Sequence, residues 1–566
     1  MLIHAPSVYD FRKETIFYGP ISDLIPSTPV FEMYPFGFVT IAAHLHREGY
    51  RVRIVNLASL MLSDRNFDVE SFIKNLSSNV YGIDLHWLPH AHGSLEVARL
   101  IKKYHPDSKI LFGGLSSTYF HRELINYPQV DLVLRGDSTE IPVASLMEAV
   151  EKNDDFTRVP NLTWKRDGKV FENPLAFVPE DIDFLDVDYG WMIKSVIKYR
   201  DLKGFKPFRD WDRYPLVAAF SVRGCTMNCV VCGGSCTAMR TFLGRAKPAF
   251  RTPEKLASDV YNIGCHFDSP IFVVGDLRQG GKEYARRFFD EVKKLGVENH
   301  LILEIFTPAD REFFRMVSAA VEQFSVQFSP DSHEEDVRFA LGRKFDNKSI
   351  ESTVEHALNH SCSRFDMFFM IGLPEQTVES AIKTSDYARH LYKKLDHKEK
   401  LFFYISPLAP FLDPGSCAFE DPEKYGYRVF ARTLEEHRSR LLNPSWKQVL
   451  SYETKWMTRA EIVGASYDAA ECLNKVRFEE GLMSVDDYEL LSMRIRLAKT
   501  MVEEIDLAES IKDPEERTHR LQMIKEKADQ LMESTICKKR DLEWDTKGVF
   551  RSIPRALFGF LIKKRI

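Results

Sequence analysis

Residues 221–234 read Ser221-Val222-Arg223-Gly224-Cys225-Thr226-Met227-Asn228-Cys229-Val230-Val231-Cys232-Gly233-Gly234 and place three cysteines at the spacing C-x3-C-x2-C. An apolar run over residues 216–220 precedes them, which predicts a buried strand that opens into a glycine-flanked loop. Three thiolates in one compact loop suit an iron–sulfur cluster, which is normally held by four cysteines. With three protein ligands, one iron keeps a position for another ligand.

This spacing resembles the signature of the radical S-adenosylmethionine (SAM) superfamily. The resemblance implies that Cys225, Cys229 and Cys232 bind a 4Fe-4S cluster, and that the methionine part of SAM chelates the open iron. Many members carry an aromatic residue before the third cysteine, where this chain has Val231. Cys236 adds a fourth thiol nearby, and we expect it to be free. A structural zinc site and an electron-transfer cluster are the alternatives.

The composition is that of an ordinary globular chain. Its 566 residues predict about three domains. A hydrophobic content of 44% and a net charge of −5 give no general attraction to nucleic acid, so we expect no nucleic-acid partner. The nine cysteines form no paired framework, and we find no signal peptide and no apolar run of membrane-spanning length. We therefore expect a cytoplasmic protein.

Residues 1–150 alternate strand and helix patterns, which predicts an α/β fold with a doubly wound, Rossmann-like parallel sheet. The expected strands are Met1–His4, Val52–Val55, Val80–Asp84, Lys109–Phe112 and Val130–Leu134. Ligands of such sheets bind at the carboxyl ends of the strands. The candidate cofactor-binding residues at those ends are Gly82, Asp84, Gly113 and Gly114.

This order of elements resembles the cobalamin-binding domain that precedes many radical SAM enzymes. The resemblance implies that Gly113-Gly114 lies against the corrin or its nucleotide tail. The family's D-x-H-x-x-G motif, whose histidine binds cobalt, is absent. Asp84-Leu85-His86 matches its first half, but Pro89 replaces the glycine and the stretch follows the third strand. Either cobalamin binds without that histidine, or the domain has lost the cofactor.

Three histidines lie close together in this stretch: His86, His90 and His92. Histidine is a common metal ligand, so a metal site is one interpretation. The other interpretation is that these histidines are ordinary loop residues with no functional role, and this is the one that we expect.

From residue 215, six strand patterns alternate with helices. The expected strands are Leu216–Phe220, Ile271–Val274, Leu301–Phe306, Phe324–Phe328, Met367–Ile371 and Leu401–Ile405. Six repeats predict a partial (β/α)6 barrel over residues 215–419, which is the core that the radical SAM resemblance implies. Functional residues of such barrels lie at the carboxyl ends of the strands.

Several strand ends resemble SAM-binding motifs of the family. Gly275-Asp276 resembles its G-G-E motif, which implies that Asp276 holds the ammonium group of SAM. Ser329 and Asp331 follow the fourth strand, where the family contacts ribose and carboxylate, and Arg343 suits a carboxylate by bidentate pairing. Gly372 opens a turn over residues 372–377 that resembles the G-L-P-G-E-T turn of cobalamin-type members.

The remaining residues form two further regions. We expect a connector over residues 151–214, with a hairpin at Asp167-Gly168, and a mostly helical region over 420–566. Within the latter, Lys547–Ile566 carries six basic and no acidic residues among apolar ones, which fits peripheral contact with an anionic membrane. A tail docked on the barrel is the alternative.

Taken together, the resemblances imply an enzyme. A reduced cluster would cleave SAM to a 5′-deoxyadenosyl radical, which abstracts hydrogen from an unactivated carbon, and cobalamin would support C-methylation. One alternative is a cobalamin-independent cyclase, coupling or rearrangement enzyme, including one that acts on a lipid. Another, of a different class, is an iron–sulfur electron carrier. The expected partners are a small-molecule or lipid substrate and an external one-electron reductant such as flavodoxin or ferredoxin.

Overall fold

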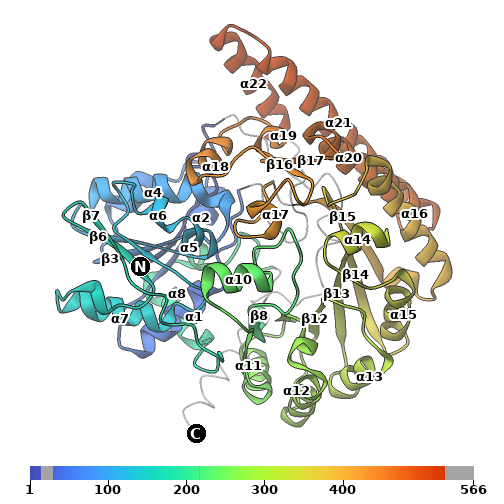
Figure 1. The fold of residues 1–566 in the computed structure, drawn as a ribbon, viewed down its shortest axis with the longest axis horizontal. Helices are drawn as coiled ribbons and strands as arrows, with labels where there is room; N and C mark the ends of the chain where they lie inside the picture. Colours follow the sequence, from blue (N-terminus) through green and yellow to red (C-terminus); the bar gives the residue numbers. More distant parts are fainter. Residues whose placement is uncertain (15–29, 186, 214, 216, 409, 530–566) are drawn as a thin grey trace.

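The computed structural model describes residues 1–14, 30–185, 187–213, 215, 217–408 and 410–529. The basic segment Lys547–Ile566 lies outside the described residues. Figure 1 shows an amino-terminal α/β domain beside a second α/β unit, with carboxy-terminal helices and loops along one side of both.

The amino-terminal domain is built on one seven-stranded sheet in the order β2-β1-β3-β4-β5-β6-β7. Its strands are β1 (Leu2–His4), β2 (Ile54–Asn56), β3 (Val80–Asp84), β4 (Lys109–Gly113), β5 (Leu132–Leu134), β6 (Leu162–Arg166) and β7 (Lys169–Glu172). The first five are parallel, which confirms the doubly wound sheet. The hairpin expected in the connector is β6–β7, which extends this sheet as two antiparallel strands.

Helices cover both faces of this sheet (Figure 1). Because all five residues of β3 are buried, the centre of the sheet has no solvent-facing side. The helices are α1 (Gly37–Arg47), α2 (Leu57–Ser63), α3 (Val69–Lys74), α4 (Ala91–Tyr104), α5 (Leu115–Tyr119), α6 (His121–Leu124) and α7 (Glu140–Glu151), followed by α8 (Tyr189–Tyr199) and α9 (Leu202–Phe205). The strand order reverses between β1 and β3, and the crevice at such a switch point is where ligands of these sheets bind.

The second unit is an open barrel of six parallel strands in the order β15-β14-β13-β12-β11-β8. The strands are β8 (Val217–Phe220), β11 (Ile271–Val274), β12 (Leu301–Ile305), β13 (Phe324–Asp331), β14 (Cys362–Ile371) and β15 (Leu401–Pro407). The helices that alternate with them are α11 (Pro253–His266), α12 (Lys282–Leu295), α13 (Arg311–Ala320), α14 (Glu335–Ala340), α15 (Asn347–Leu358) and α16 (Val378–Lys394). The two edge strands do not pair, so the predicted partial barrel is confirmed.

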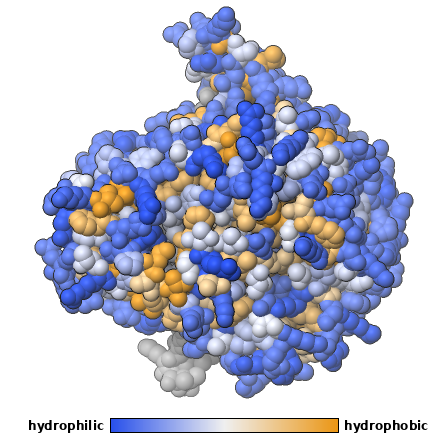
Figure 2. Space-filling view, in the orientation of Figure 1, coloured by the Kyte–Doolittle hydropathy of each residue, from blue (hydrophilic) through white to orange (hydrophobic). Residues whose placement is uncertain are grey.

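The carboxy-terminal region combines helices with one small sheet. Its elements are α17 (Cys417–Glu420), β16 (Tyr427–Val429), α18 (Leu434–Arg440), α19 (Trp446–Val449), β17 (Tyr452–Thr454), α20 (Arg459–Glu479), α21 (Val485–Glu509) and α22 (Pro514–Asp529). The antiparallel pair β16–β17 is not part of the expected helical pattern. Helix α20 packs on α16 and β15, and α22 projects from the molecule with a largely hydrophilic surface (Figures 1 and 2). Among the described residues, we find no helix with the length and apolarity needed to span a membrane.

Buried ion pairs fix the amino-terminal domain against the barrel. The guanidinium of Arg223, in the short strand β9 (Val222–Arg223), donates to both carboxylate oxygens of Glu140 at 2.6 and 2.9 Å. Arg245 forms a second pair with Asp137, just after β5. The rings of Trp87, after β3, and Phe411, after β15, lie 5.5 Å apart. These contacts all involve segments that follow strands, so the carboxyl edges of the two sheets face each other.

Candidate functional site

The cysteine loop lies at the carboxyl end of β8, between β9 and helix α10 (Cys236–Leu243). Its entry needs glycine, because Gly224 has φ +92° and a Cβ there would lie 2.9 Å from the Arg245 side chain. Backbone N–H groups point at two of the sulfurs: Met227 N lies 3.4 Å from Cys225 Sγ, and Gly234 N lies 3.3 Å from Cys232 Sγ. Such donors stabilise thiolate sulfur in iron–sulfur sites.

Segments from the far end of the barrel brace this loop. The amide of Val230 donates to the carbonyl of Leu341 at 3.0 Å, and the carbonyl of Val230 accepts from Ala418 at 2.8 Å. The amide of Gly233 donates to the carboxylate of Asp413 at 3.0 Å. These three hydrogen bonds tie the cysteine loop to the segments that follow β13 and β15.

The surroundings of the three cysteines favour the neutral thiol as long as no metal is bound. Burial raises the pKa of Cys225 and Cys229, and raises that of Cys232 to about 12. The cationic side chain of Arg343 opposes this effect at Cys225 and Cys229. Metal binding would remove these protons. In the described part of the chain, no three His, Cys, Asp or Glu side chains lie close enough together to bind one metal ion. Thiols that bind separate irons of one cluster need not be that close.

The side chain of Asp276 is buried, and both of its carboxylate oxygens accept hydrogen bonds from other protein groups. Its carboxylate accepts from the Arg278 backbone at 3.0 Å, from the Arg278 guanidinium at 2.9 and 2.5 Å, and from the amide of Phe306 at 2.8 Å. Arg278 in turn donates to the carbonyls of Thr307 and Pro308. Asp276 thus ties the turn after β11 to the turn after β12, and its oxygens do not face an open site. Its role as an ammonium ligand stays a prediction.

Glu304 offers the free carboxylate oxygen that Asp276 lacks. It lies near the carboxyl end of β12, and its Oε2 accepts from the amide of Gly275 at 2.9 Å. Its Oε1 makes no hydrogen bond with any described residue. Burial, reinforced by the negative charge of Asp276, raises the pKa of Glu304 to about 7. Glu304 therefore carries an acceptor beside the glycine of the expected SAM motif.

The other residues predicted at the barrel mouth have mixed surroundings. Arg343 pairs with Asp331 at 2.5 Å and donates to the carbonyl of Phe306 at 2.8 Å, which places it between the turn after β12 and the cysteine loop. Ser329 is half-buried, and its hydroxyl has no hydrogen bond within the described chain. Gly372 has φ +99° and lies under the hydroxyl of Tyr452, so its lack of a side chain is a packing requirement.

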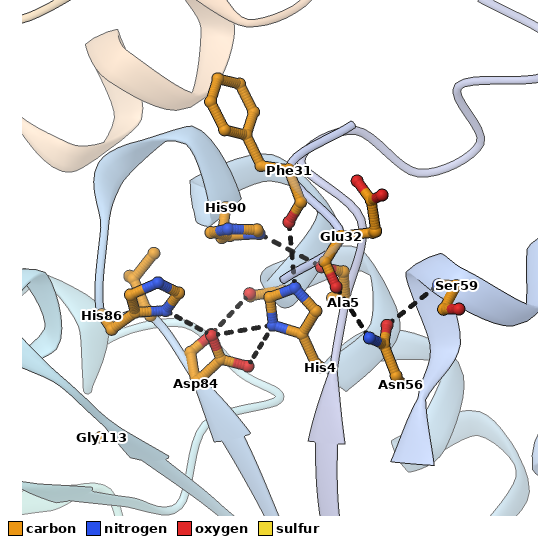
Figure 3. A network of polar contacts seen from close by, with 12 residues as sticks. His4, Ala5, Phe31, Glu32, Asn56, Ser59, Asp84, His86, His90 and Gly113 are labelled. Atoms are coloured by element: carbon orange, nitrogen blue, oxygen red, sulfur yellow. Dashed lines mark hydrogen bonds and ion pairs between the residues drawn. The ribbon is translucent and has the colours of Figure 1, made fainter. Parts of the chain in front are cut away.

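A polar network occupies the switch point of the first sheet (Figure 3). The carboxylate of Asp84, at the end of β3, contacts Nδ1 of His4, at the end of β1, at 2.9 and 3.1 Å. It also contacts Nδ1 of His86 at 2.6 Å. Burial alone raises the pKa of Asp84, but the two histidines hold it far below its ordinary value. The network therefore places an ionised carboxylate beneath a half-exposed imidazole.

The three glycines predicted at the ends of this sheet differ in what they face. A Cβ at Gly82 would meet the side chain of Leu2 at 2.8 Å, so this residue belongs to the core. A Cβ at Gly114, where φ is +115°, would meet the backbone of His86 at 2.5 Å, so this glycine permits two chain segments to touch. A Cβ at Gly113 would meet nothing nearer than the carbonyl of Leu134 at 4.0 Å, which leaves it as the open position.

Comparisons with known proteins match both halves of the chain. The sequence model of the B12 binding domain family matches residues 24–145. The structure of the radical S-adenosylmethionine methyltransferase TsrM from Kitasatospora setae, with cobalamin and a [4Fe-4S] cluster bound, superposes with a TM-score of 0.58 at 13% identity, covering 94% of this chain and 98% of that one. Residues 24–145 therefore match the B12 binding domain family, and the chain as a whole has the fold of a solved radical SAM methyltransferase.

Two further known proteins extend the comparison. The structure of OxsB with aqua-cobalamin and S-adenosylmethionine matches with a TM-score of 0.51 at 12% identity, over 100% of this chain and 79% of that one. Cytidylyl-2-hydroxyethylphosphonate methyltransferase of Streptomyces wedmorensis is 23% identical over 480 residues, or 74% of this chain and 86% of that protein. Both likenesses extend well beyond the amino-terminal domain.

Two candidate functional residues, Glu304 and His4, are absent from the residues predicted by sequence. Glu304 interrupts the apolar strand Leu301–Ile305, and an isolated acidic residue in a buried strand is the signal that could identify it. His4 is the last residue of the first strand, and only its contact with Asp84 on the neighbouring strand marks it as a candidate functional residue. That pairing depends on which strands are neighbours, which one sequence does not specify.

Proposed function

We propose that this protein is a cobalamin-dependent radical SAM methyltransferase that methylates an unactivated carbon. The observation that carries the proposal is that the switch point of the B12 binding domain and the cysteine loop lie on sheet edges that face each other. The rings of Trp87 and Phe411 are in contact between these edges. Two buried ion pairs, Arg223–Glu140 and Arg245–Asp137, connect the two domains. When bound, the cluster would supply the electron that cleaves SAM, and the corrinoid would supply the methyl group.

The residues of the barrel suit the two ends of SAM. Cys225, Cys229 and Cys232 would hold the cluster. The free oxygen of Glu304 suits the ammonium group, because a charge-assisted hydrogen bond favours a cation beside a carboxylate. Arg343 lies near Cys229 and suits the carboxylate group. The half-buried hydroxyl of Ser329 remains the candidate for a ribose contact.

The methyltransferase assignment is supported by the relatives whose names describe that activity, and by the B12 binding domain match. The substrate is a small molecule or a lipid, and an external one-electron reductant such as flavodoxin or ferredoxin would serve the cluster.

Reductive cleavage of SAM tests this function. The protein is purified without oxygen, its cluster is reconstituted, and it is incubated with SAM and dithionite. We expect 5′-deoxyadenosine and methionine to form only when the reductant and the cluster are both present. Formation of neither product by cluster-loaded protein would contradict the radical SAM chemistry. 5′-Deoxyadenosine formation that is unaffected by added cobalamin, from protein that retains no corrinoid, would favour the cobalamin-independent alternative.

Gly113 offers a steric test of the corrinoid site. We expect Gly113→Trp to block corrinoid binding while the cluster content stays unchanged, because the new side chain enters open space at the carboxyl edge of β4. Corrinoid retained through gel filtration and iron per protein are the two measurements. Gly114→Ala is the contrasting variant: its Cβ clashes with the His86 backbone, so we expect it to lower the melting temperature. Full corrinoid retention by folded Gly113→Trp would place the cofactor elsewhere.

A further inference from the structure

We propose that His86 is the protein ligand to the cobalt of the bound corrinoid, with Asp84 and His4 as its positioning residues. The inference rests on the proposed function for the presence of the corrinoid. Its own basis is the network at the switch point between β1 and β3 (Figure 3). In a sheet of order 2-1-3-4-5, this is the crevice in which a flat cofactor is bound.

Three histidine rings gather at this point, and only one of them has a nitrogen available. His4 is fully buried, and its two nitrogens face the Asp84 carboxylate and the carbonyl of Phe31, the latter at 3.0 Å. His90 is buried to 1% exposure, and its Nδ1 contacts the carbonyl of Ala5 at 3.2 Å. The side chain of His86 is 28% exposed, and its Nε2 makes no hydrogen bond with a described residue. His86 is therefore the one that can reach a ligand.

The contact with Asp84 sets the tautomer of His86. Asp84 accepts at 2.6 Å from Nδ1, so the hydrogen lies on Nδ1 and the lone pair on Nε2. A carboxylate behind an imidazole is the arrangement that orients histidine ligands and raises their basicity. His4 anchors the other side of the carboxylate, and the ring of His90 stacks on His86 at 5.2 Å. The imidazole is thus held in place before any metal arrives.

A cobalt corrinoid fits this single nitrogen better than a free metal ion does. A site made by protein alone needs three or more ligands, and the described residues provide no such group here. A corrin ring would bring its own nitrogen ligands for the cobalt, so a single protein nitrogen would be enough. The open position at Gly113 lies beside this point, at the end of the neighbouring strand β4 (Figure 3). His86 would then replace the missing D-x-H-x-x-G histidine from a different strand.

Electron paramagnetic resonance of the cobalt(II) form tests the assignment directly. The protein is produced in cells supplied with ¹⁵N-histidine and is then loaded with unlabelled cobalamin. The bound corrinoid is reduced to the cobalt(II) form. A histidine ligand labelled in this way splits each cobalt line into a doublet. We expect the doublet in the wild type, its loss in His86→Ala, and its retention in His46→Ala, a control at an exposed histidine of the same domain.

The other outcomes overturn the inference. A triplet in the labelled wild type would mean that the cofactor's own benzimidazole nitrogen binds cobalt. Unsplit lines would mean that no nitrogen binds, and a doublet that survives in His86→Ala would assign another histidine. All three leave the proposed function intact, because corrinoid is bound in each. If wild type retains no corrinoid at all, the cobalamin part of the proposed function fails along with this inference.

Discussion

Alanine at any one of Cys225, Cys229 or Cys232 is expected to abolish cluster binding and with it all SAM cleavage. Each thiol would hold a different iron, so removing one leaves a second iron without a protein ligand, and two thiols are too few to retain the cluster. Cys236→Ala is the matched control. Cys236 begins helix α10, where its amide already bonds to the carbonyl of Met227 at 2.8 Å, and its side chain is not needed for the loop.

Iron and sulfide content after anaerobic reconstitution measures this expectation. The loop is braced by Leu341, Asp413 and Ala418 through backbone groups of Val230 and Gly233, so the three alanine variants should remain folded. Circular dichroism checks that point. A full cluster in Cys229→Ala, or loss of the cluster only in Cys236→Ala, would show that the ligand set is wrong.

Glu304→Gln is expected to weaken SAM binding by roughly 10- to 100-fold, because a hydrogen bond to a charged group contributes about 1.5–3 kcal/mol. The amide keeps the shape of the side chain, so the fold should not change. Isothermal titration calorimetry with SAM, on protein with an intact cluster, gives the dissociation constant. Equal affinities of variant and wild type would remove Glu304 from the SAM site.

The raised pKa of Glu304 adds a pH dependence to this prediction. Its carboxyl group is neutral below about pH 7 and ionised above it, so SAM affinity should rise as the pH increases through that value. The rise should be absent in Glu304→Gln. Asp276→Asn gives the contrast: it breaks the buried pair with Arg278, and we expect it to lower the free energy of unfolding by roughly 3–5 kcal/mol.

The sequence predicted the architecture well because buried parallel strands are short apolar runs at regular spacing. Val80–Asp84 and Ile271–Val274 match their predicted bounds, and the six barrel strands follow in the predicted order. The apolar pattern does not predict where a strand ends when its last residues are polar. The predicted strand Phe324–Phe328 continues to Asp331, because pairing with β14 carries it past the apolar run.

The site was less predictable than the fold, because a motif gives a residue's position along the chain and not the direction of its side chain. Asp276 follows the right strand, but Arg278, two residues later, turns its carboxylate into the protein. Glu304 comes from the next strand and faces Gly275 only because β12 pairs with β11. Gly114 has the residue type expected at a corrin surface, yet its backbone neighbour is His86.

The absorption spectrum of the reconstituted protein after gel filtration tests the central claim most directly. The claim is that one chain holds a cluster at the barrel mouth and a corrinoid at the facing edge of the amino-terminal sheet. Protein loaded without oxygen with iron, sulfide and cobalamin should elute with both the broad cluster absorption and the corrinoid bands, in equal amounts per chain. Cluster absorption with no corrinoid, at every cobalamin concentration tried, would contradict it and leave the amino-terminal domain as a scaffold.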